Sequence, residues 1–253
     1  MRVVAESTDG DVDERLFAVE VEGERVPGVV WAPAGATDGR PLILMGHGCT
    51  QHKKVESLVV RARRYVTAYG FAVAAIDAPF HGERVTPAEA AAFRESVERF
   101  LAEGRPAEAR VARDQVTRAV KAVPEWRAAL DALQQLAFVG RRAPVGYWGL
   151  SMGTSFGIPL VAAEPRIRCA VFGLSGLPAD NDMLAQAAAR VNVPIEFAMQ
   201  ADDEVIPPAA GLALFDALGS REKTLHLNAG GHLGVPTYER ASWEEFYLRH
   251  LAR

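Results

Sequence analysis

The sequence predicts an α/β fold, in which a mostly parallel sheet of eight strands carries helices on both faces. Short apolar runs bounded by glycine or proline alternate with longer amphipathic segments along most of the chain. This is the pattern of parallel strands connected by helices. The length of 253 residues suits one large domain with a substantial core. Residues 144–159 add a short apolar strand, a turn with glycine on both sides and the start of a helix.

The composition excludes several classes of protein. Hydrophobic residues make up 49% and charged residues 24%, which is ordinary for a soluble globular domain. The net charge of −4 is mild and evenly spread, which argues against nucleic acid or an anionic membrane as a partner. No apolar run approaches the ~18 residues of a membrane span, and residues 1–15 lack the apolar core of a signal peptide.

Cysteine usage points to a reducing compartment. Cys49 and Cys169 are two isolated cysteines without pairing or metal-binding spacing. We therefore expect a cytoplasmic protein, and we expect no metal and no cofactor, since no group of ligands has the spacing of a metal site. The sequence leaves open whether the chain is a monomer or a homo-oligomer.

The N-terminal part of the chain predicts a β-hairpin followed by an α/β alternation. Residues 17–22 alternate apolar and polar side chains, as a half-buried strand does, and Gly23 provides the turn to the next strand. A helix with one apolar stripe follows and ends at Gly70. The expected elements up to this point are strands at 17–22, 26–31 and 42–45, a helix at 55–69 and a strand at 71–76.

The alternation returns after residue 124. Proline at that position is expected to begin a new helix, which leads into the strand before Ser151. The expected elements are helices at about 126–137, 154–161, 208–218 and 239–251, and strands at 145–149, 169–173, 195–199 and 224–227.

Residues 84–122 interrupt this rhythm with two helices where one connection would suffice. Thr86-Pro87-Ala88-Glu89 predicts a capping box with proline at the first helical position. Gly104-Arg105-Pro106 is expected to end the first helix, and a second is expected from 108 to 123. We interpret the chain as one domain, 1–253, with a helical cap at about 84–122; the alternative is a surface decoration.

The turn at 149–153 has the pattern G-x-S-x-G, which places Ser151 above the end of the sheet. A serine hydroxyl is a weak nucleophile and needs a base to accept its proton. His232 lies in a glycine-rich loop after the last strand, from which it could reach Ser151, and Asp203 follows the preceding strand and could orient it. The sequence thus predicts a catalytic Ser151, Asp203 and His232.

The oxyanion formed during attack on a carbonyl needs hydrogen-bond donors. We expect the backbone amide of Met152, at the start of a helix, and that of Cys49, in the loop after strand 42–45. The Cys49 thiol is interpreted as a small packed side chain. The residues expected to contact the substrate are His47, Phe80, Phe93 and Phe100.

From about Leu16 to the last helix, the chain resembles the α/β-hydrolase superfamily. The matching motifs are His47-Gly48, the D-x-P-x-H-G loop 77–82, the Ser151 turn, Asp203-x-Val205-x-Pro207 and Gly231-His232. The dienelactone-hydrolase-like and acetyl-esterase-like branch is the most similar. Dienelactone hydrolases carry cysteine where this chain has Ser151, and the resemblance therefore implies ester hydrolysis rather than that specific activity.

The resemblance also selects the acid among three neighbouring carboxylates. Asp203 has the family's spacing to Val205 and Pro207. Successive side chains diverge near a strand end, so we expect Asp202 to face backbone amides of the loop and Glu204 to face solvent.

We therefore expect a carboxylesterase-type serine hydrolase that acts on a small-molecule ester through an acyl-enzyme. An acyltransferase, a hydrolase or lyase of carbon–carbon bonds, and a non-catalytic ligand-binding protein on this fold remain open. The arginines of the cap could select an acidic substrate, although helical arginines commonly form a solvated face. They are Arg94, Arg99, Arg110, Arg113 and Arg118.

Overall fold

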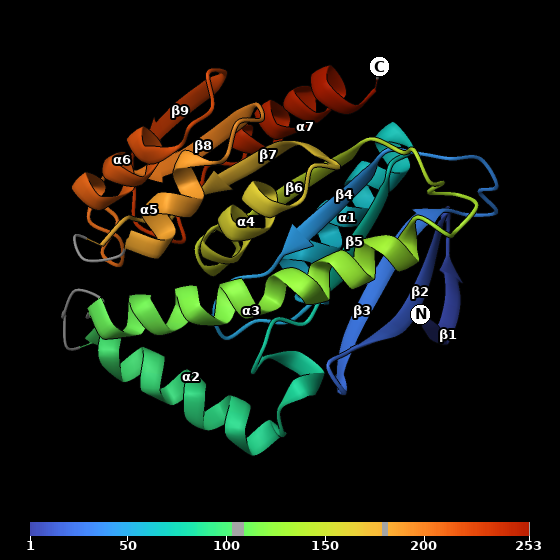
Figure 1. Ribbon diagram of the computed structural model, residues 1–253, viewed down its shortest axis with the longest axis horizontal. Helices are drawn as coiled ribbons and strands as arrows, with labels where there is room; N and C mark the ends of the chain where they lie inside the picture. The colour runs from blue at the N-terminus through green and yellow to red at the C-terminus, as the bar shows by residue number, and fades with distance from the viewer. Residues whose placement is uncertain (103–108, 179–181, 253) are drawn as a thin grey trace.

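The computed structural model describes residues 1–102, 109–178 and 182–252, and it contains one nine-stranded sheet (Figure 1). The strand order is β1-β2-β3-β5-β4-β6-β7-β8-β9. Pairs from β1 to β3, and β3 with β5, are antiparallel, whereas the pairs from β5 to β9 are parallel. The strands are β1 Arg2–Asp9, β2 Val12–Val21, β3 Glu24–Pro33, β4 Leu42–Gly46, β5 Ala72–Ile76, β6 Val145–Gly149, β7 Ile167–Gly173, β8 Ile195–Gln200 and β9 Lys223–Asn228.

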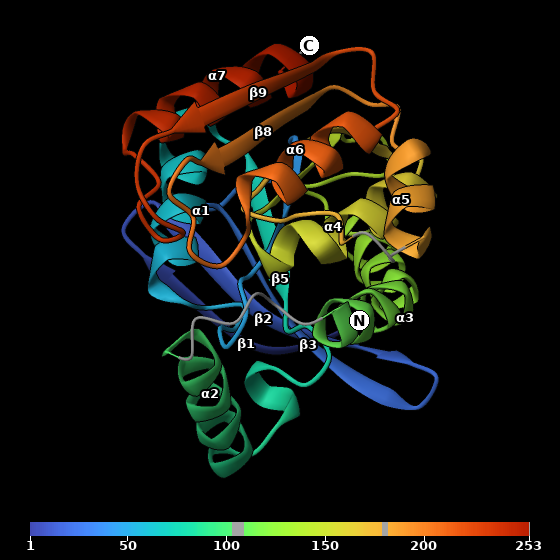
Figure 2. The ribbon, with the colours of Figure 1, turned by 90° about the vertical axis from the view of Figure 1, so that its left-hand side faces the viewer.

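Helices cover both faces of this sheet (Figures 1 and 2). The helices α1 and α7 bury their apolar side chains against one face, and α3, α4, α5 and α6 cover the other. Their bounds are α1 Glu56–Tyr69, α2 Pro87–Ala102, α3 Ala109–Leu133, α4 Met152–Ala163, α5 Asp182–Ala189, α6 Pro208–Ala217 and α7 Tyr238–Leu251, with a short 3-10 helix η1 at Gly82–Arg84. None of the helices in the described ranges is long and apolar enough to span a membrane.

The predicted fold class is confirmed, and the predicted count of eight strands is wrong by one. The additional strand is β1, whose eight side chains are all exposed. It pairs with β2 along nearly its whole length. Because backbone hydrogen bonds hold this edge strand and none of its side chains is buried, it carries no apolar alternation from which a strand could be predicted.

The expected break at Pro124 is also wrong, because α3 runs through it from Ala109 to Leu133. A proline inside a helix costs about 3 kcal/mol. The following turns bury Trp126, Leu130 and Leu133 completely or nearly so. Each such side chain contributes roughly 1.5–3 kcal/mol on burial, which outweighs the lost hydrogen bond. The helix α5 was not predicted either.

The first helix of the predicted cap segment, α2, begins as predicted and stands away from the sheet (Figure 2). The capping box is confirmed: the Thr86 amide donates to Glu89 Oε2 at 2.8 Å, and the Glu89 amide donates to Thr86 Oγ1 at 3.3 Å. The expected helix stop at 104–106 lies outside the described residues.

Candidate active site

Ser151, Asp203 and His232 follow the carboxyl ends of β6, β8 and β9. These strands are parallel, so their following loops emerge at the same edge of the sheet. Ligands of open α/β sheets bind at this edge. Cys49, after β4, and Asp77, after β5, belong to the same set of loops.

The turn that carries Ser151 is strained. Ser151 has φ 56° and ψ −120°, in the half of backbone space that residues with a Cβ rarely adopt. Both flanking glycines are required by close packing. A Cβ on Gly149 would lie 2.6 Å from the Gly153 carbonyl oxygen, and a Cβ on Gly153 would lie 2.6 Å from that of Gly46. The strand and helix therefore close around the serine only with glycine at these two positions.

Buried hydrogen bonds hold this turn in place. The Ser151 amide donates to the Gly173 carbonyl at 2.9 Å. Thr154 Oγ1 lies 2.8 Å from the Gly149 carbonyl oxygen and accepts the Gly173 amide at 2.8 Å, and the Tyr147 hydroxyl donates to the Gly153 carbonyl at 2.7 Å. The roles of Tyr147 and Thr154 were not predicted, because the two residues have the pattern of ordinary strand and helix positions.

The three predicted catalytic side chains form one hydrogen-bonded chain. His232 Nε2 lies 3.0 Å from Ser151 Oγ. The other ring nitrogen, Nδ1, lies 2.8 Å from Asp203 Oδ2 and 3.0 Å from Oδ1. His232 is 7% exposed and the Asp203 side chain 3%, so these two groups are shielded from solvent. In this arrangement Nδ1 donates to the carboxylate and Nε2 can accept the serine proton.

Asp203 is held as a carboxylate. Burial opposes its ionisation, but the hydrogen bond from His232 and those from the Ile206 and Val205 amides outweigh it and keep the pKa below its ordinary value. The two amides donate to Asp203 Oδ1 at 2.8 and 2.9 Å. A permanent negative charge thus faces the imidazole.

The neighbouring carboxylates have other partners. Asp202 Oδ2 accepts the Gly230 amide at 3.0 Å, which confirms that it faces the backbone of the loop. Glu204 does not simply face solvent: its Oε2 accepts the backbone amide of His232 at 2.9 Å. This hydrogen bond lowers the pKa of the Glu204 carboxyl. All three acidic residues therefore contact the loop that carries His232, each at a different point.

His47 lies inside the molecule, at 3% exposure, between the loops after β4 and β5. Its Nδ1 donates to the Gly48 carbonyl at 2.9 Å, and its Nε2 accepts the Ala78 amide at 3.0 Å. Burial lowers the pKa of His47 to about 4. Because both ring nitrogens are occupied by backbone groups, His47 fixes the loop beside Cys49 and has no ring nitrogen left for a substrate.

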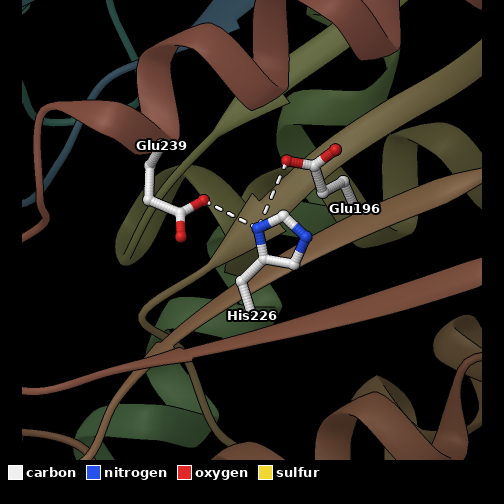
Figure 3. A group of neighbouring side chains, drawn as sticks. All are labelled: Glu196, His226 and Glu239. Atoms are coloured by element: carbon white, nitrogen blue, oxygen red, sulfur yellow. Dashed lines mark hydrogen bonds and ion pairs between the residues drawn. The ribbon is translucent and has the colours of Figure 1, made fainter.

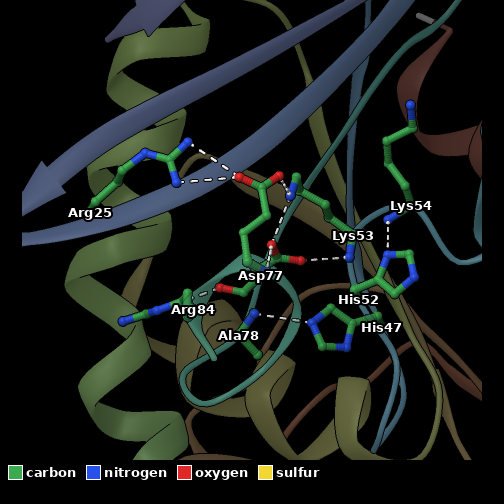
Figure 4. Close-up of polar contacts among 9 residues, drawn as sticks. Arg25, His47, His52, Lys53, Lys54, Asp77, Ala78 and Arg84 are labelled. Atoms are coloured by element: carbon green, nitrogen blue, oxygen red, sulfur yellow. Dashed lines mark hydrogen bonds and ion pairs between the residues drawn. The ribbon is translucent and has the colours of Figure 1, made fainter. Parts of the chain in front are cut away.

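A buried ion pair ties the same two loops together (Figure 4). The Lys53 amide and ammonium donate to the two oxygens of Asp77 at 2.8 and 2.7 Å. Asp77 is fully buried and Lys53 is 4% exposed. Gly82, with φ 56°, passes so close to Asp77 that a Cβ would lie 2.2 Å from Asp77 Cγ. The role of Lys53 was not predicted, because no local sequence feature marks a lysine that becomes buried.

Of the two predicted oxyanion donors, Met152 lies at the start of α4 and Cys49 lies in the loop that His47 and Lys53 hold. Met152 is the first residue of α4, so its amide has no carbonyl partner within the helix. Cys49 follows His47 and Gly48 in the loop after β4. Burial raises the pKa of the Cys49 thiol, which supports its interpretation as a packed, unreactive side chain.

The predicted substrate-contacting phenylalanines differ in their surroundings. Phe80 is 61% exposed, with the Arg118 guanidinium 4.8 Å from its ring centroid. The half-buried Phe93 meets the His81 ring edge to face at 5.7 Å. Phe100 lies in α2, but its side chain is outside the described residues.

The arginines of the predicted cap segment do not form one group in the described part of the chain. Arg94 and Arg99 are exposed on α2, as expected of a solvated face. The side chains of Arg110 and Arg113 lie outside the described residues. Arg118 contacts the ring of Phe80, which lies in the same loop as His81.

No protein-family model matches the sequence, and no match was found among curated proteins. Solved structures do match. A polyethylene-glycol-bound cold-adapted esterase from an Arctic intertidal metagenomic library is 35% identical, with 97% of each chain covered and a TM-score of 0.78.

Two further structures extend the comparison. A zinc-bound structure of a cold-adapted esterase from such a library is 33% identical over 99% of this chain and 100% of that one, with a TM-score of 0.77. An acetyl xylan esterase from Paenibacillus sp. R4 is 14% identical over 99% and 88%, with a TM-score of 0.72, and shows the likeness of fold alone. Its sheet, its Ser151 turn and its similarity to the two cold-adapted esterases show that the chain belongs to the esterase branch of the α/β-hydrolase superfamily.

Proposed function

We propose that the protein is a carboxylesterase-type serine hydrolase that cleaves small-molecule esters through an acyl-enzyme. One observation carries the proposal: Ser151 Oγ, His232 and the Asp203 carboxylate are linked by hydrogen bonds of 3.0 and 2.8 Å. A nucleophile, a base and a group that orients the base, each within hydrogen-bond distance of the next, are what acyl transfer to serine requires.

In the first half-reaction, Ser151 Oγ attacks the ester carbonyl while its proton passes to His232 Nε2. The negative charge that develops on the carbonyl oxygen is stabilised by the amides of Met152 and Cys49. His232 then gives the proton to the departing alkoxide, which leaves as the alcohol, and Ser151 carries the acyl group.

In the second half-reaction, His232 takes a proton from water, and the resulting hydroxide attacks the acyl carbonyl. Collapse of this intermediate breaks the bond to Ser151 Oγ, which recovers its proton from His232, and the carboxylic acid is released. Asp203 stays ionised throughout and stabilises the imidazolium. Every proton in the scheme is carried by His232, so the reaction as written uses no cofactor.

The test is Ser151→Ala, with Ser155→Ala as its matched control. Ser155 lies one turn further along α4, buried and hydrogen-bonded to Ser175 at 3.0 Å, and takes no part in the scheme. We expect Ser151→Ala to lower turnover of p-nitrophenyl acetate by about 10⁴- to 10⁶-fold, and to abolish labelling by a fluorophosphonate. Activity of that variant within tenfold of wild type would refute the proposal.

A graded series of p-nitrophenyl esters would then define the acyl preference, and product analysis in the presence of added alcohols would measure the partition of the acyl group. We expect the free acid to dominate; a product mixture dominated by the new ester would identify an acyltransferase instead.

The free thiols of Cys49 and Cys169 support a cytoplasmic location for the protein, because the cytoplasm keeps thiols reduced.

A further inference from the structure

A second group of chemically active side chains lies where β8, β9 and the start of α7 meet. Glu196 comes from β8, His226 from β9 and Glu239 from the first turn of α7. One ligand atom of each residue lies within 4.8 Å of the ligand atoms of the other two. Among the described residues, no other three His, Cys, Asp or Glu side chains are grouped in this way. Figure 3 shows both carboxylates turned toward the same ring nitrogen of His226.

The three side chains enclose one point. His226 Nδ1 lies 2.8 Å from Glu239 Oε2 and 3.6 Å from Glu196 Oε1. Tetrahedral zinc with bonds of 2.0–2.2 Å to nitrogen and oxygen sets its ligand atoms roughly 3.3 Å apart. The two observed distances lie on either side of this value. A zinc ion would fit if Glu239 moved outward by about half an ångström and Glu196 moved inward by less.

The hydrogen bonds within the cluster leave one carboxylate oxygen unsatisfied. The Glu196 side chain is 7% exposed, and its Oε1, which points at His226, has no hydrogen-bond partner. Glu239 is 3% exposed in its side chain. The Ser242 side chain also hydrogen-bonds the Glu196 carboxylate, and the charge of Arg249 acts on it. Oε1 itself still has no partner, and a buried acceptor without a partner is costly.

We propose that Glu196, His226 and Glu239 bind a zinc ion, through one oxygen of each carboxylate and Nδ1 of the histidine. The ion would replace the proton that Nδ1 now donates to Glu239, and the ring proton would lie on Nε2. An imidazole with two carboxylates suits zinc, whereas magnesium and calcium prefer oxygen ligands alone. The 26% exposure of the His226 side chain leaves room for water as the fourth ligand.

The position of the site suggests its role. His226 lies two residues before the end of β9, and Glu239 is the second residue of α7. The segment between them, 227–238, contains His232. Because zinc would join both ends of this segment to β8, it would restrict the loop that holds the proposed catalytic base. This is a structural metal site outside the reacting atoms, and it does not depend on the proposed ester chemistry.

The test uses the full chain, freed of metal with EDTA and titrated with ZnCl₂ alone. Calorimetry is expected to give one equivalent of zinc at this site, and zinc at ~100 times Kd is expected to raise Tm by roughly 5–10 °C. Magnesium chloride should do neither. Hydrogen exchange should slow in residues 227–238 on addition of zinc.

The variants Glu196→Gln and Glu239→Gln should each weaken zinc binding more than about tenfold. The matched control is Glu222→Gln, which removes the carboxylate of another His–Glu pair, 3.3 Å from His250, and should bind zinc as wild type does. Zinc affinity within twofold of wild type in both cluster variants would overturn the proposal.

Anomalous diffraction at the zinc edge, from wild-type crystals grown with zinc, decides the matter even if a variant fails to fold. A peak among Glu196, His226 and Glu239 would establish the site. A peak only at His232, or only at surface histidines, would refute it.

Discussion

At the scale of single residues, Asp203 and Asp202 are neighbours in the chain but have different hydrogen-bond partners. Both oxygens of Asp203 face His232 Nδ1, whereas Asp202 binds the Gly230 amide. We expect Asp203→Asn to lower turnover by roughly 10⁴, because the amide no longer stabilises the imidazolium or selects the productive tautomer. Asp202→Asn retains an oxygen that can accept from Gly230, and should stay within a few-fold of wild type. Steady-state kinetics on one activated ester, with circular dichroism to check folding, would reveal a reversed ranking.

Glu204 presents a different case, because it contacts the backbone of His232 rather than the ring. Glu204→Gln keeps an oxygen for the His232 amide and should be nearly neutral. Glu204→Ala removes the acceptor of the His232 amide at an exposed site, where water can take its place. We expect a loss of no more than about a hundredfold in kcat, with KM little changed. Equal kinetics for the two variants would show that this contact does not position His232.

Much of the site could be predicted from short local motifs in the sequence. The G-x-S-x-G turn, the glycine-rich loop of His232 and the spacing after Asp203 are local features, and the structure brings these three side chains within hydrogen-bond distance. The roles of Lys53 and Glu204 could not be predicted, because no local motif marks either residue for its contact with Asp77 or with the His232 amide. The same holds for Glu196, His226 and Glu239, which come from three separate elements and have no metal-binding spacing in the sequence.

At the scale of elements, local signals predicted the helix ends well and the helix interiors less well. The capping box at Thr86 and the left-handed Gly70 after α1, with φ 68°, depend on a few adjacent residues. The continuity of α3 through Pro124 depends on what its buried face meets, since the helix is held against the sheet by Trp126 and the leucines after it. Similarly, β1 exists because β2 offers it a backbone to pair with.

The helix α2 contacts the loop after β5 through Phe93, whose ring packs on His81. If the segment 84–122 acts as a cap, Phe93→Ala should alter the ratio of kcat/KM between long and short acyl chains by roughly tenfold, since a half-buried aromatic side chain contributes a few kcal/mol at most. Turnover of an acetyl ester should change less. A p-nitrophenyl ester series measures this ratio, and equal losses on every ester would show general destabilisation in place of a lid.

At the scale of the whole molecule, the loops around the site are held by buried polar groups as well as by apolar packing. Arg84 on η1 forms a two-pronged ion pair with Glu125 of α3 at 2.7 and 2.8 Å, which joins the loop after β5 to the helices. Lys53 and Asp77 join that loop to the one after β4. A hydrogen-bonded, buried pair of this kind is costly to break from one side, by about 3–5 kcal/mol. The active-site edge of the sheet is therefore a cross-linked set of loops, and its integrity depends on the protonation of its members.

The effect of protonation on the stability of these loops can be measured at His47. Its pKa falls from the usual 6.5 to about 4 in the folded protein, chiefly through burial. The neutral ring is also the form that accepts the Ala78 amide. The unfolded chain therefore binds a proton that the folded protein does not, between about pH 6.5 and 4. The stabilisation that His47 gives the folded protein is fully present above pH 6.5 and is lost as the pH falls toward 4. The loss is on the order of 3 kcal/mol, because one pKa unit corresponds to about 1.4 kcal/mol.

We expect urea unfolding of the wild type to show this decline between pH 7 and pH 4.5, and His47→Gln to flatten it. Glutamine cannot gain a proton, and its amide can still offer both a donor and an acceptor to the two loops. The neighbouring His81, whose pKa burial also lowers, will leave part of the slope in the variant. His52→Gln, an exposed histidine of the same loop, is the matched control and should retain the wild-type slope. If His47→Gln and wild type lose stability in parallel over this range, His47 is already protonated in the folded protein. A neutral His47 ring then does not join Gly48 to Ala78.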